Sequence, residues 1–458
     1  MSQGKPSIPK GTRDFSPEKM LRRNHIINTI KKVYETYGFL PLETPAMENL
    51  SVLTGKYGDE GDQLIFKILN SGDYLNGLTE NPLDLGAKKL TPLISEKALR
   101  YDLTVPFARY VAMNRHTINF PFRRYQIQPV WRADRPQKGR YREFYQCDAD
   151  IVGTNSLVCE AEILCMLQEV FSQLGIKAYK VKLNNRKLLT AIAEVCGHPG
   201  KEAELCMAID KLDKISREEV IKELLSRGFS EAAVEKLNPI FELQGSNTEK
   251  LSQIETYLNG NTTGKEGVAE LREIFDHYKA FTGSSPDAFV DIDFTLARGL
   301  SYYTGAIIEV KALSVSIGSI SGGGRYDNLT GVFGLPDLSG VGISFGIDRL
   351  YDVMDELMLF EQLFMNATKV IICHFDQESL AEGQKLVYLL RSKGIYSEIY
   401  PETGKIKKQL SYADGKKIPF AIIIGSDEIK TQRYTLKNLS SGTQDSLTID
   451  SIIKLIEP

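Results

Sequence analysis

The chain has few cysteines and histidines, and their spacing excludes two common ways of stabilising a fold. Its six cysteines contain no Cys-x-x-Cys pair, which argues against a disulfide framework and against a thiolate zinc site. The five histidines are too scattered along the chain to form a metal cluster. We therefore expect no protein-bound structural metal and a reduced, cytoplasmic protein.

Long apolar runs are also missing. No apolar segment approaches about 18 residues, which excludes a transmembrane helix. The N-terminal stretch MSQGKPSIPKGTRDF has no apolar core of the kind that a secretory signal needs. Apolar residues make up 42% and charged residues 25% of the 458 positions, as in soluble globular proteins. This length predicts about three domains, and the composition predicts no membrane partner.

Complete glycine-rich nucleotide motifs are absent as well. Residues 260–266 (GNTTGKE) are one position short of a P-loop and carry glutamate where a hydroxyl must bind magnesium. Residues 340–346 (GVGISFG) are one position too long for a dinucleotide fingerprint, and their glycines open a predicted strand rather than follow one. The glycines of residues 321–325 (SGGGR) indicate by themselves only a flexible loop.

The net charge of −3 gives no sign of a nucleic-acid partner, but the charges are unevenly distributed. Residues 97–142 hold eleven Lys/Arg and two acidic residues, a balance of +9, whereas the rest of the chain has a balance of −12. The arginines lie among aromatic residues that include Trp131, the only tryptophan. A positive, aromatic segment in an acidic chain is typical of a site that binds phosphate.

Hydrophobic periodicity predicts a mixed α/β core that is interrupted by a helical insertion. The predicted parts are a first part of the core (1–184), the insertion (185–284), a second part of the core (285–356), a linker (357–367) and a small α/β domain (368–458). A second positive segment lies in the last domain, where residues 404–437 hold eight Lys/Arg and three acidic residues.

Three arginines stand out within the predicted core. Residues 122–134 and 141–153 read as an antiparallel hairpin with a basic connection, RPQKGR, so Arg132 and Arg140 are expected to face each other across the loop. Arg349 falls in the first turn of a predicted helix, where the helix dipole disfavours a cation unless an anion compensates it. An arginine taken singly is more often a surface residue than a phosphate-binding one. Together they predict a triphosphate held by side chains.

Six segments carry a family resemblance. FLPLETPAMENL, with Pro45, resembles the first class motif of the class II aminoacyl-tRNA synthetases; the hairpin with its WRAD and RPQKGRYREFYQ stretches resembles the second; and GVGISFGIDRL resembles the third. Residues 183–189 (LNNRKLL), 296–305 (LARGLSYYTG) and 322–329 (GGGRYDNL) resemble segments of the histidyl-tRNA synthetase family. The resemblance covers essentially the whole chain. It implies an α/β fold, with an α+β catalytic core on an antiparallel sheet flanked by helices, the helical insertion, and a C-terminal α/β anticodon-binding domain.

The resemblance implies a reaction as well. ATP and L-histidine form histidyl-adenylate and pyrophosphate, and histidine is then transferred to the 3′ end of tRNA(His). ATP is a substrate that brings Mg²⁺, and the first motif implies a homodimer. The basic loop is expected to contact the acceptor end of the tRNA, and residues 404–437 the anticodon.

Site residues follow from the matched positions. The catalytic residues implied are Arg298 and Arg132. The ATP-binding set implied is Arg132, Asp134, Arg140, Phe144 and Arg349. The histidine-binding set implied is Asp102, Thr104, Arg132, Gln146, Asp150, Arg298, Tyr302, Tyr303 and Tyr326, in which Asp150 and Tyr303 read the imidazole. The tRNA acceptor contacts implied are Arg135, Gln137 and Lys138. The chain departs from the family at Ser301, where an aspartate is usual, and at Asp134, where many members have glutamate.

Two other interpretations remain open. A non-catalytic relative of the family acts as a regulatory subunit of histidine biosynthesis, but such relatives typically lack the anticodon domain and the catalytic arginines. This chain keeps Arg132, Arg298 and Arg349. The other alternative is a nonspecific RNA-binding protein, which would bind unrelated tRNAs equally.

Overall fold

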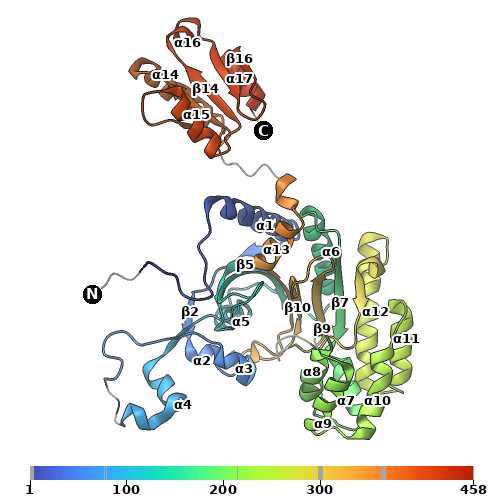
Figure 1. Ribbon diagram of the computed structural model, residues 1–458. Coiled ribbons are helices and arrows are strands. Elements are labelled where there is room, and N and C mark those ends of the chain that lie inside the picture. Colours follow the sequence, from blue (N-terminus) through green and yellow to red (C-terminus); the bar gives the residue numbers. More distant parts are fainter. Residues whose placement is uncertain are drawn as a thin grey trace. The chain divides into compact units, whose positions relative to one another are not determined.

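The computed structural model describes residues 5–76, 78, 80–213, 215–297, 303–362 and 368–456. The chain forms two compact units, one of Met1–Asp14 with Arg23–Phe360 and one of Phe15–Arg22 with Glu361–Pro458 (Figure 1). No helix within the described ranges is long and apolar enough to cross a membrane.

An eight-stranded sheet forms the centre of the larger unit, with the strand order β1-β5-β6-β11-β10-β9-β7-β8. Its interior pairings are antiparallel, and only the edge pairs β1–β5 and β7–β8 are parallel. The strands are β1 (Leu40–Pro41), β5 (Phe122–Trp131), β6 (Glu143–Val152), β11 (Gly340–Gly346), β10 (Ser321–Tyr326), β9 (Ala306–Ala312), β7 (Tyr179–Asn185) and β8 (Val290–Ile292). The predicted class, a largely antiparallel sheet flanked by helices, is confirmed.

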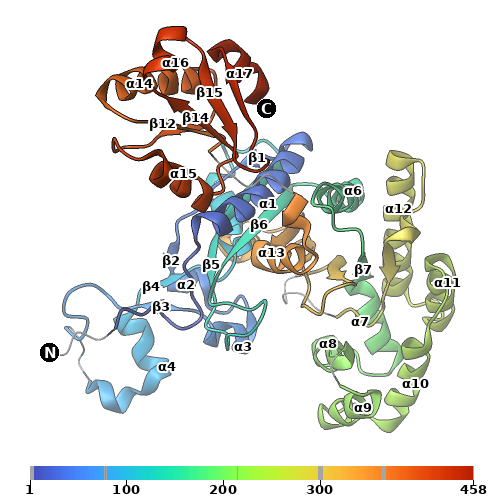
Figure 2. The same ribbon diagram turned by 45° about the horizontal axis from the view of Figure 1, so that its top comes forward.

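Helices cover this sheet because their apolar residues recur at helical spacing. In α1 (Pro17–Thr36) the residues Ile26, Ile30, Val33 and Tyr34 are buried, and the Tyr34 hydroxyl donates to the Cys147 carbonyl of β6 at 2.7 Å. The helices α6 (Val158–Gln173) and α13 (Ile347–Glu356) also pack on the sheet, the first against β11 and the second against β6 (Figure 2). The α5 helix (Thr104–Asn114) follows the segment that carries Asp102.

A helical segment lies between β7 and β8 in the sequence. Its helices are α7 (Arg186–Val195), α8 (Glu202–Ile209), α9 (Arg217–Ser226), α10 (Glu231–Glu242), α11 (Asn247–Tyr257) and α12 (Thr262–Thr282). Residues 260–266 are the start of α12, where the Asn261 side chain accepts from Gly264 N at 2.9 Å. This stretch is therefore a helix N-cap rather than a phosphate loop, as its incomplete motif predicted.

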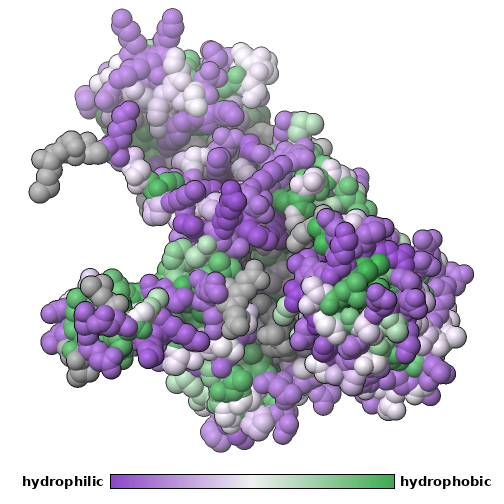
Figure 3. All heavy atoms as spheres, turned by 60° about the horizontal axis from the view of Figure 1, so that its bottom comes forward, coloured by the Kyte–Doolittle hydropathy of each residue, from purple (hydrophilic) through white to green (hydrophobic). Residues whose placement is uncertain are grey.

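Smaller elements complete the larger unit. A three-stranded sheet has the order β2 (Met47–Asn49), β4 (Lys97–Leu99) and β3 (Lys67–Ile68), accompanied by α2 (Leu50–Leu53), α3 (Gly58–Gln63) and α4 (Pro82–Ile94). Hydrophilic residues cover most of the face in Figure 3, and hydrophobic patches interrupt it on the lobe that carries α4, at the left. The exposed apolar side chains of this region include Leu69, Tyr74, Leu75 and Leu93.

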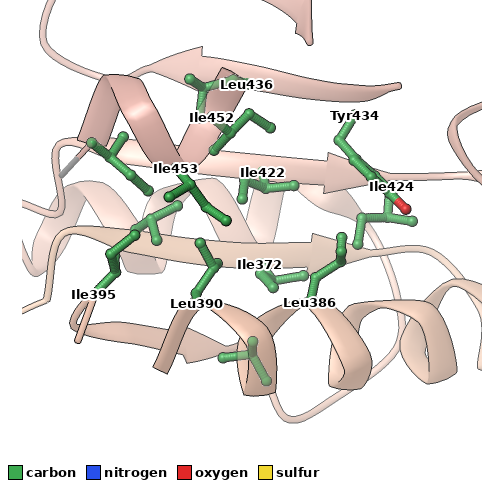
Figure 4. Close-up of a cluster of buried hydrophobic side chains, with 13 residues drawn as sticks. Ile372, Leu386, Leu390, Ile395, Ile422, Ile424, Tyr434, Leu436, Ile452 and Ile453 are labelled. Atoms are coloured by element: carbon green, nitrogen blue, oxygen red, sulfur yellow. The ribbon is translucent and has the colours of Figure 1, made fainter. Parts of the chain in front are cut away.

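The smaller unit contains a five-stranded sheet of order β13-β12-β14-β15-β16. The strands are β12 (Val370–His374), β13 (Ser397–Ile399), β14 (Phe420–Ile424), β15 (Tyr434–Asn438) and β16 (Gln444–Leu447), with α14 (Gln377–Ser392), α15 (Ile406–Gly415), α16 (Ser426–Thr431) and α17 (Ile449–Ile456). Because β12 and β14 are covered on both faces, their apolar residues are continuous rather than alternating. Ile372 and Ile422 face a cluster that includes Ile452 and Leu390 (Figure 4), whereas Ile371 faces the opposite cluster.

The expectation of a flexible loop at residues 321–325 is wrong, because these residues belong to β10. The glycines permit an unusually close approach of β10 to β11. A Cβ atom on Gly323 would lie 2.0 Å from the carbonyl oxygen of Gly342, closer than real Cβ contacts allow. The run of small residues that resembles a loop in the sequence is therefore a requirement of sheet packing.

A buried ion pair joins β10 to α6 and yields a stability prediction. Arg325 Nε and Nη2 donate to the two carboxylate oxygens of Glu160 at 2.6 and 2.7 Å, and both side chains are buried. We expect Glu160→Gln to lower the free energy of unfolding by about 3–5 kcal/mol, because it leaves the buried arginine charge without its hydrogen-bonded carboxylate. Urea denaturation measures the change.

Glu255→Gln is the matched control, since it breaks an exposed pair with Arg272. It should cost less than about 1 kcal/mol. An equally small loss for Glu160→Gln would contradict the role given to the buried pair.

Candidate active site

One face of β6 forms the floor of the site. Side chains alternate along a strand, so Phe144, Gln146, Asp148 and Asp150 share a face. The register with β11 sets Gly346 opposite Gln146, Ser344 opposite Asp148 and Gly342 opposite Asp150. Polar residues on one strand therefore meet small residues on the next, which leaves space above the sheet.

That space is a cavity of about 460 Å³. Gly322 and Gly323 of β10 and Gly346 of β11 line it, and the absence of side chains at these positions leaves room for a ligand. The side chains lining it come from β6, β9, β10, β11, the start of α13, and the segments around residues 101–104 and 132–141. The cavity thus collects residues that lie as much as 248 positions apart, from Tyr101 to Arg349.

Nine of the residues implied by the family resemblance line this cavity: Asp102, Thr104, Arg132, Asp134, Arg140, Phe144, Gln146, Tyr303 and Arg349. Asp150 and Tyr326 are buried and do not line it, and neither do the loop residues Arg135, Gln137 and Lys138. Arg298 and Tyr302 lie outside the described residues, as does Ser301.

Two aromatic rings and one backbone carbonyl orient Arg132. Its guanidinium lies 4.2 Å from the ring centroid of Tyr101 and 5.2 Å from that of Phe144, and its Nε donates to the Tyr101 carbonyl at 3.0 Å. Cation–π contacts and this hydrogen bond restrict the rotamers of the side chain. The cation is therefore set in place before any substrate arrives.

Arg349 is fixed by two carbonyl groups. Its Nε donates to the Gly139 carbonyl at 2.8 Å and its Nη1 to the Ser319 carbonyl at 2.6 Å. These contacts offset the unfavourable position of a cation in the first turn of α13. They also connect α13 to the loop 135–140.

The hairpin loop differs from the expected pairing. Arg132 N donates to the Arg142 carbonyl at 3.0 Å, whereas Arg140 pairs with Gln137 in a tight turn. Arg140 and Arg132 therefore do not face each other across the hairpin, although both line the cavity. The expectation assumed that the strands extend to the loop, but the tight turn at residues 137–140 shifts the register.

The loop also contacts α13 through a side chain, since Lys138 forms an ion pair with Glu356 at 2.7 Å.

Two buried acceptors mark another part of the cavity wall. Asp102 Oδ1 accepts from Tyr57 Oη at 3.0 Å and from Val105 N at 3.1 Å, but Asp102 Oδ2 has no hydrogen-bond partner among the described residues. Gln146 Nε2 donates to Ser344 Oγ at 3.1 Å, while Gln146 Oε1 has no partner there either. Burial raises the pKa of Asp102 above its usual value. Unsatisfied acceptors beside a cavity are suited to a ligand that donates hydrogen bonds.

Behind these acceptors lies a buried charge cluster. Arg124 forms an ion pair with Asp150 at 2.7 Å, and the Tyr326 hydroxyl donates to Asp150 Oδ1 at 2.6 Å. Burial raises the pKa of Asp148 to about 7; the Arg124 guanidinium opposes this rise and the Asp150 carboxylate adds to it. Two carboxyl groups with one arginine favour retention of a proton on this face of the sheet near neutral pH.

Several lining residues were not anticipated from the sequence, among them Tyr101, Tyr141, Glu309, Ser319 and Asp348. Glu309 is buried and accepts a hydrogen bond from the Ser319 hydroxyl. A lone acidic residue within the apolar strand AIIEVKA is a signal that points to it. Within the described ranges, no group of three or more His, Cys, Asp or Glu residues is arranged to hold a metal ion.

Comparison with known proteins identifies relatives along the whole chain. The family model described as Histidyl-tRNA synthetase matches residues 73–350, and the Anticodon binding domain model matches residues 369–457. The histidine–tRNA ligase of Cytophaga hutchinsonii is 60% identical over 453 residues, which cover 99% of this chain and 100% of that protein. The histidine–tRNA ligase of Phocaeicola vulgatus is 54% identical, with 99% of each chain covered.

A solved structure agrees with these relatives. The crystal structure of histidyl-tRNA synthetase from Nostoc sp. PCC 7120 superimposes with a TM-score of 0.83 at 31% identity and covers 98% of each chain. The full-length identities favour the ligase over the regulatory alternative. The chain therefore belongs to the histidyl-tRNA synthetase family of class II aminoacyl-tRNA synthetases.

Proposed function

We propose that this cavity is where the chain, as a histidine–tRNA ligase, joins L-histidine to ATP. One observation carries the assignment: three arginines, Arg132, Arg140 and Arg349, line the same cavity as the unpaired acceptors Asp102 Oδ2 and Gln146 Oε1. The arginines suit a triphosphate, and the acceptors suit the ammonium group of an amino acid. No separate site needs to be invoked for either substrate.

Adenylate formation needs positioning more than proton transfer. A histidine carboxylate oxygen attacks the α-phosphorus of ATP, the bond to the β-phosphate oxygen breaks, and pyrophosphate leaves. The carboxylate is already ionised, so no general base is required. Arg132 is proposed to stabilise the charge that builds up on the α-phosphate, and removing such a preorganised donor typically costs roughly 3 kcal/mol of transition-state stabilisation.

The remaining ATP contacts are proposed for other residues that line the same cavity, and for Arg298. Arg140 and Arg349 are proposed to contact the outer phosphates and the adenine face, and Phe144 to stack on the ring. Asp134 is proposed to accept from the adenine amino group. Arg298, matched by resemblance, is proposed to reach the α-phosphate as a second catalytic arginine. We expect ATP to enter as its Mg²⁺ complex.

We propose that the site recognises both the ammonium group and the imidazole ring of histidine. Asp102, Thr104 and Gln146 are proposed to accept from the ammonium group. Tyr303 and, from below the cavity floor, Asp150 are proposed to recognise the imidazole, with Tyr302 and Tyr326 beside them. Discrimination against apolar amino acids is then strong, because such ligands leave buried polar groups unpaired. The polar ladder Gln146, Asp148 and Asp150 on one face of β6 supports this orientation.

For the second step we propose contacts with tRNA(His). The loop residues Arg135, Gln137 and Lys138 are proposed to meet the acceptor end. Residues 404–437, within the match to the anticodon-binding domain, are proposed to contact the anticodon.

We also propose that the protein is a cytoplasmic homodimer whose interface uses the first motif. The chain is proposed to divide into a core (1–184 and 285–356), an insertion (185–284), a linker (357–367) and an anticodon-binding domain (368–458).

Histidine-dependent exchange of pyrophosphate into ATP tests the first step. We expect exchange that requires histidine, followed by charging of tRNA(His) in preference to unrelated tRNAs. Absence of exchange above background would contradict the assignment of this cavity.

Asp102→Asn tests the amino-acid end of the site. It removes the negative charge but keeps an acceptor for Tyr57 and Val105. We expect the KM for histidine to rise roughly 10- to 100-fold, with the KM for ATP within about twofold, because a charge-assisted hydrogen bond to the ammonium is weakened. Asp276→Asn on the exposed face of α12 is the matched control and should change neither constant. A parallel rise of both KM values would count against the assignment.

The raised pKa of Asp148 predicts a pH dependence. Below about pH 7 this carboxyl is protonated, and above it the added negative charge strengthens binding of the cationic ammonium group. Asp148→Asn has no titrating carboxyl at this position, so it lacks the stronger histidine binding above about pH 7. We expect the ratio of the histidine dissociation constants, variant over unsubstituted chain, to be close to 1 at about pH 5.5 and to reach about 10 at about pH 8.5.

Isothermal titration calorimetry at both pH values measures this ratio. The ionisation of histidine itself affects both proteins equally and cancels in the ratio. A ratio that stays constant with pH would exclude Asp148 as the titrating group.

A further inference from the structure

The N-terminal segment Pro9–Arg13 packs against the hairpin loop of the cavity. The Gly11 carbonyl accepts from Arg142 N at 2.9 Å. Gly11 has φ +88°, and a Cβ atom there would lie 2.8 Å from Arg142 Cγ and 2.9 Å from Pro136 Cγ. Glycine is therefore required both by its backbone conformation and by its close approach to the loop.

Arg13, at the end of this segment, contacts two residues that line the cavity. Its guanidinium carbon lies 3.2 Å from the ring centroid of Tyr141, and its Nη2 donates to Asp348 Oδ1. The Tyr141 hydroxyl in turn donates to Asp352 of α13 at 3.3 Å. Arg13 thus joins the hairpin loop to the first turns of α13.

The Asp348 carboxylate accepts hydrogen bonds from three donors at the cavity wall. Arg13 and Arg23 both donate to its Oδ1, and Tyr145 N donates to its Oδ2 at 3.2 Å. The side chain is only 4% exposed, and it lies next to Arg349 at the start of α13. A carboxylate in the wall of a cavity that receives a triphosphate repels that ligand unless nearby cations neutralise it.

We propose that Arg13 is a positioning residue for ATP, an inference that rests on the proposed function of the cavity. With Arg23 it neutralises Asp348, and it holds α13 against the hairpin loop so that Arg349 faces the triphosphate. Arg13 itself touches neither substrate. Its loss therefore weakens ATP binding through an uncompensated carboxylate and a loosened α13, and leaves the histidine end of the cavity unaffected.

Arg13→Ala tests this proposal. We expect the KM for ATP in pyrophosphate exchange, and the dissociation constant of a non-hydrolysable ATP analogue, to rise about tenfold, while the KM for histidine changes less than about twofold. Arg13→Lys keeps the charge and should lose no more than about threefold in either ATP constant. Arg272→Ala, which removes an exposed arginine paired with Glu255 on another face of the unit, is the matched control and should change none of them.

A double variant separates charge neutralisation from packing. Asp348→Asn keeps an acceptor for Tyr145 N and removes the negative charge. In the Arg13→Ala background it should recover at least half of the lost analogue affinity on a logarithmic scale. No recovery, or an equal rise of both KM values in Arg13→Ala, would overturn the proposal.

Failure of the proposed function has a different signature. If the unsubstituted chain lacks histidine-dependent exchange, the assignment of the cavity fails. The dissociation constants of the ATP analogue in the Arg13 variants then still test whether Arg13 supports ATP binding. If exchange is normal and the analogue affinity is the same in Arg13→Ala as in the unsubstituted chain, the inference about Arg13 is wrong and the assignment of the cavity stands.

Discussion

The close approach of β10 to β11 is the constraint on which the site depends. Side chains at Gly323 or Gly342 would collide with the backbone or with Asp150, so these strands pair only if they carry glycine there. Gly323 also lines the cavity, together with Gly322 and Gly346, so these positions without side chains leave space beside Gln146. Packing of the sheet and space for a ligand thus have one physical origin, and a methyl group would remove both.

Charge is arranged in layers around this hollow. Arg132 and Arg349 in its wall are held by carbonyls and aromatic rings, so they keep their full charge for a ligand. The carboxylates below the floor are paired with Arg124 or retain a proton, so that they do not cancel the arginines. Preorganised cations in a partly dry cavity stabilise developing charge far better than mobile ones in water.

Much of this arrangement could be predicted from the sequence, because periodicity and charge are local properties. The antiparallel hairpin of residues 122–153 and the concentration of Lys and Arg at residues 97–142 belong to this class. Contacts between distant segments could not be predicted. The SGGGR stretch has no local feature that separates a tightly packed strand from a loop. The register that pairs Arg132 with Arg142 depends on the tight turn at residues 137–140, and the burial of Asp150 depends on Arg124 across the sheet.

The contact between Arg13 and Asp348 joins residues that are 335 positions apart. At a synthesis rate of roughly 5–20 residues per second, the first of them leaves the ribosome roughly 20–70 s before the second. Throughout that interval the beginning of the chain lacks the acidic partner it has in the finished fold. The cavity of the larger unit therefore cannot be completed until α13 has been made, although Arg13, which contacts Asp348 in its wall, is among the first residues of the chain.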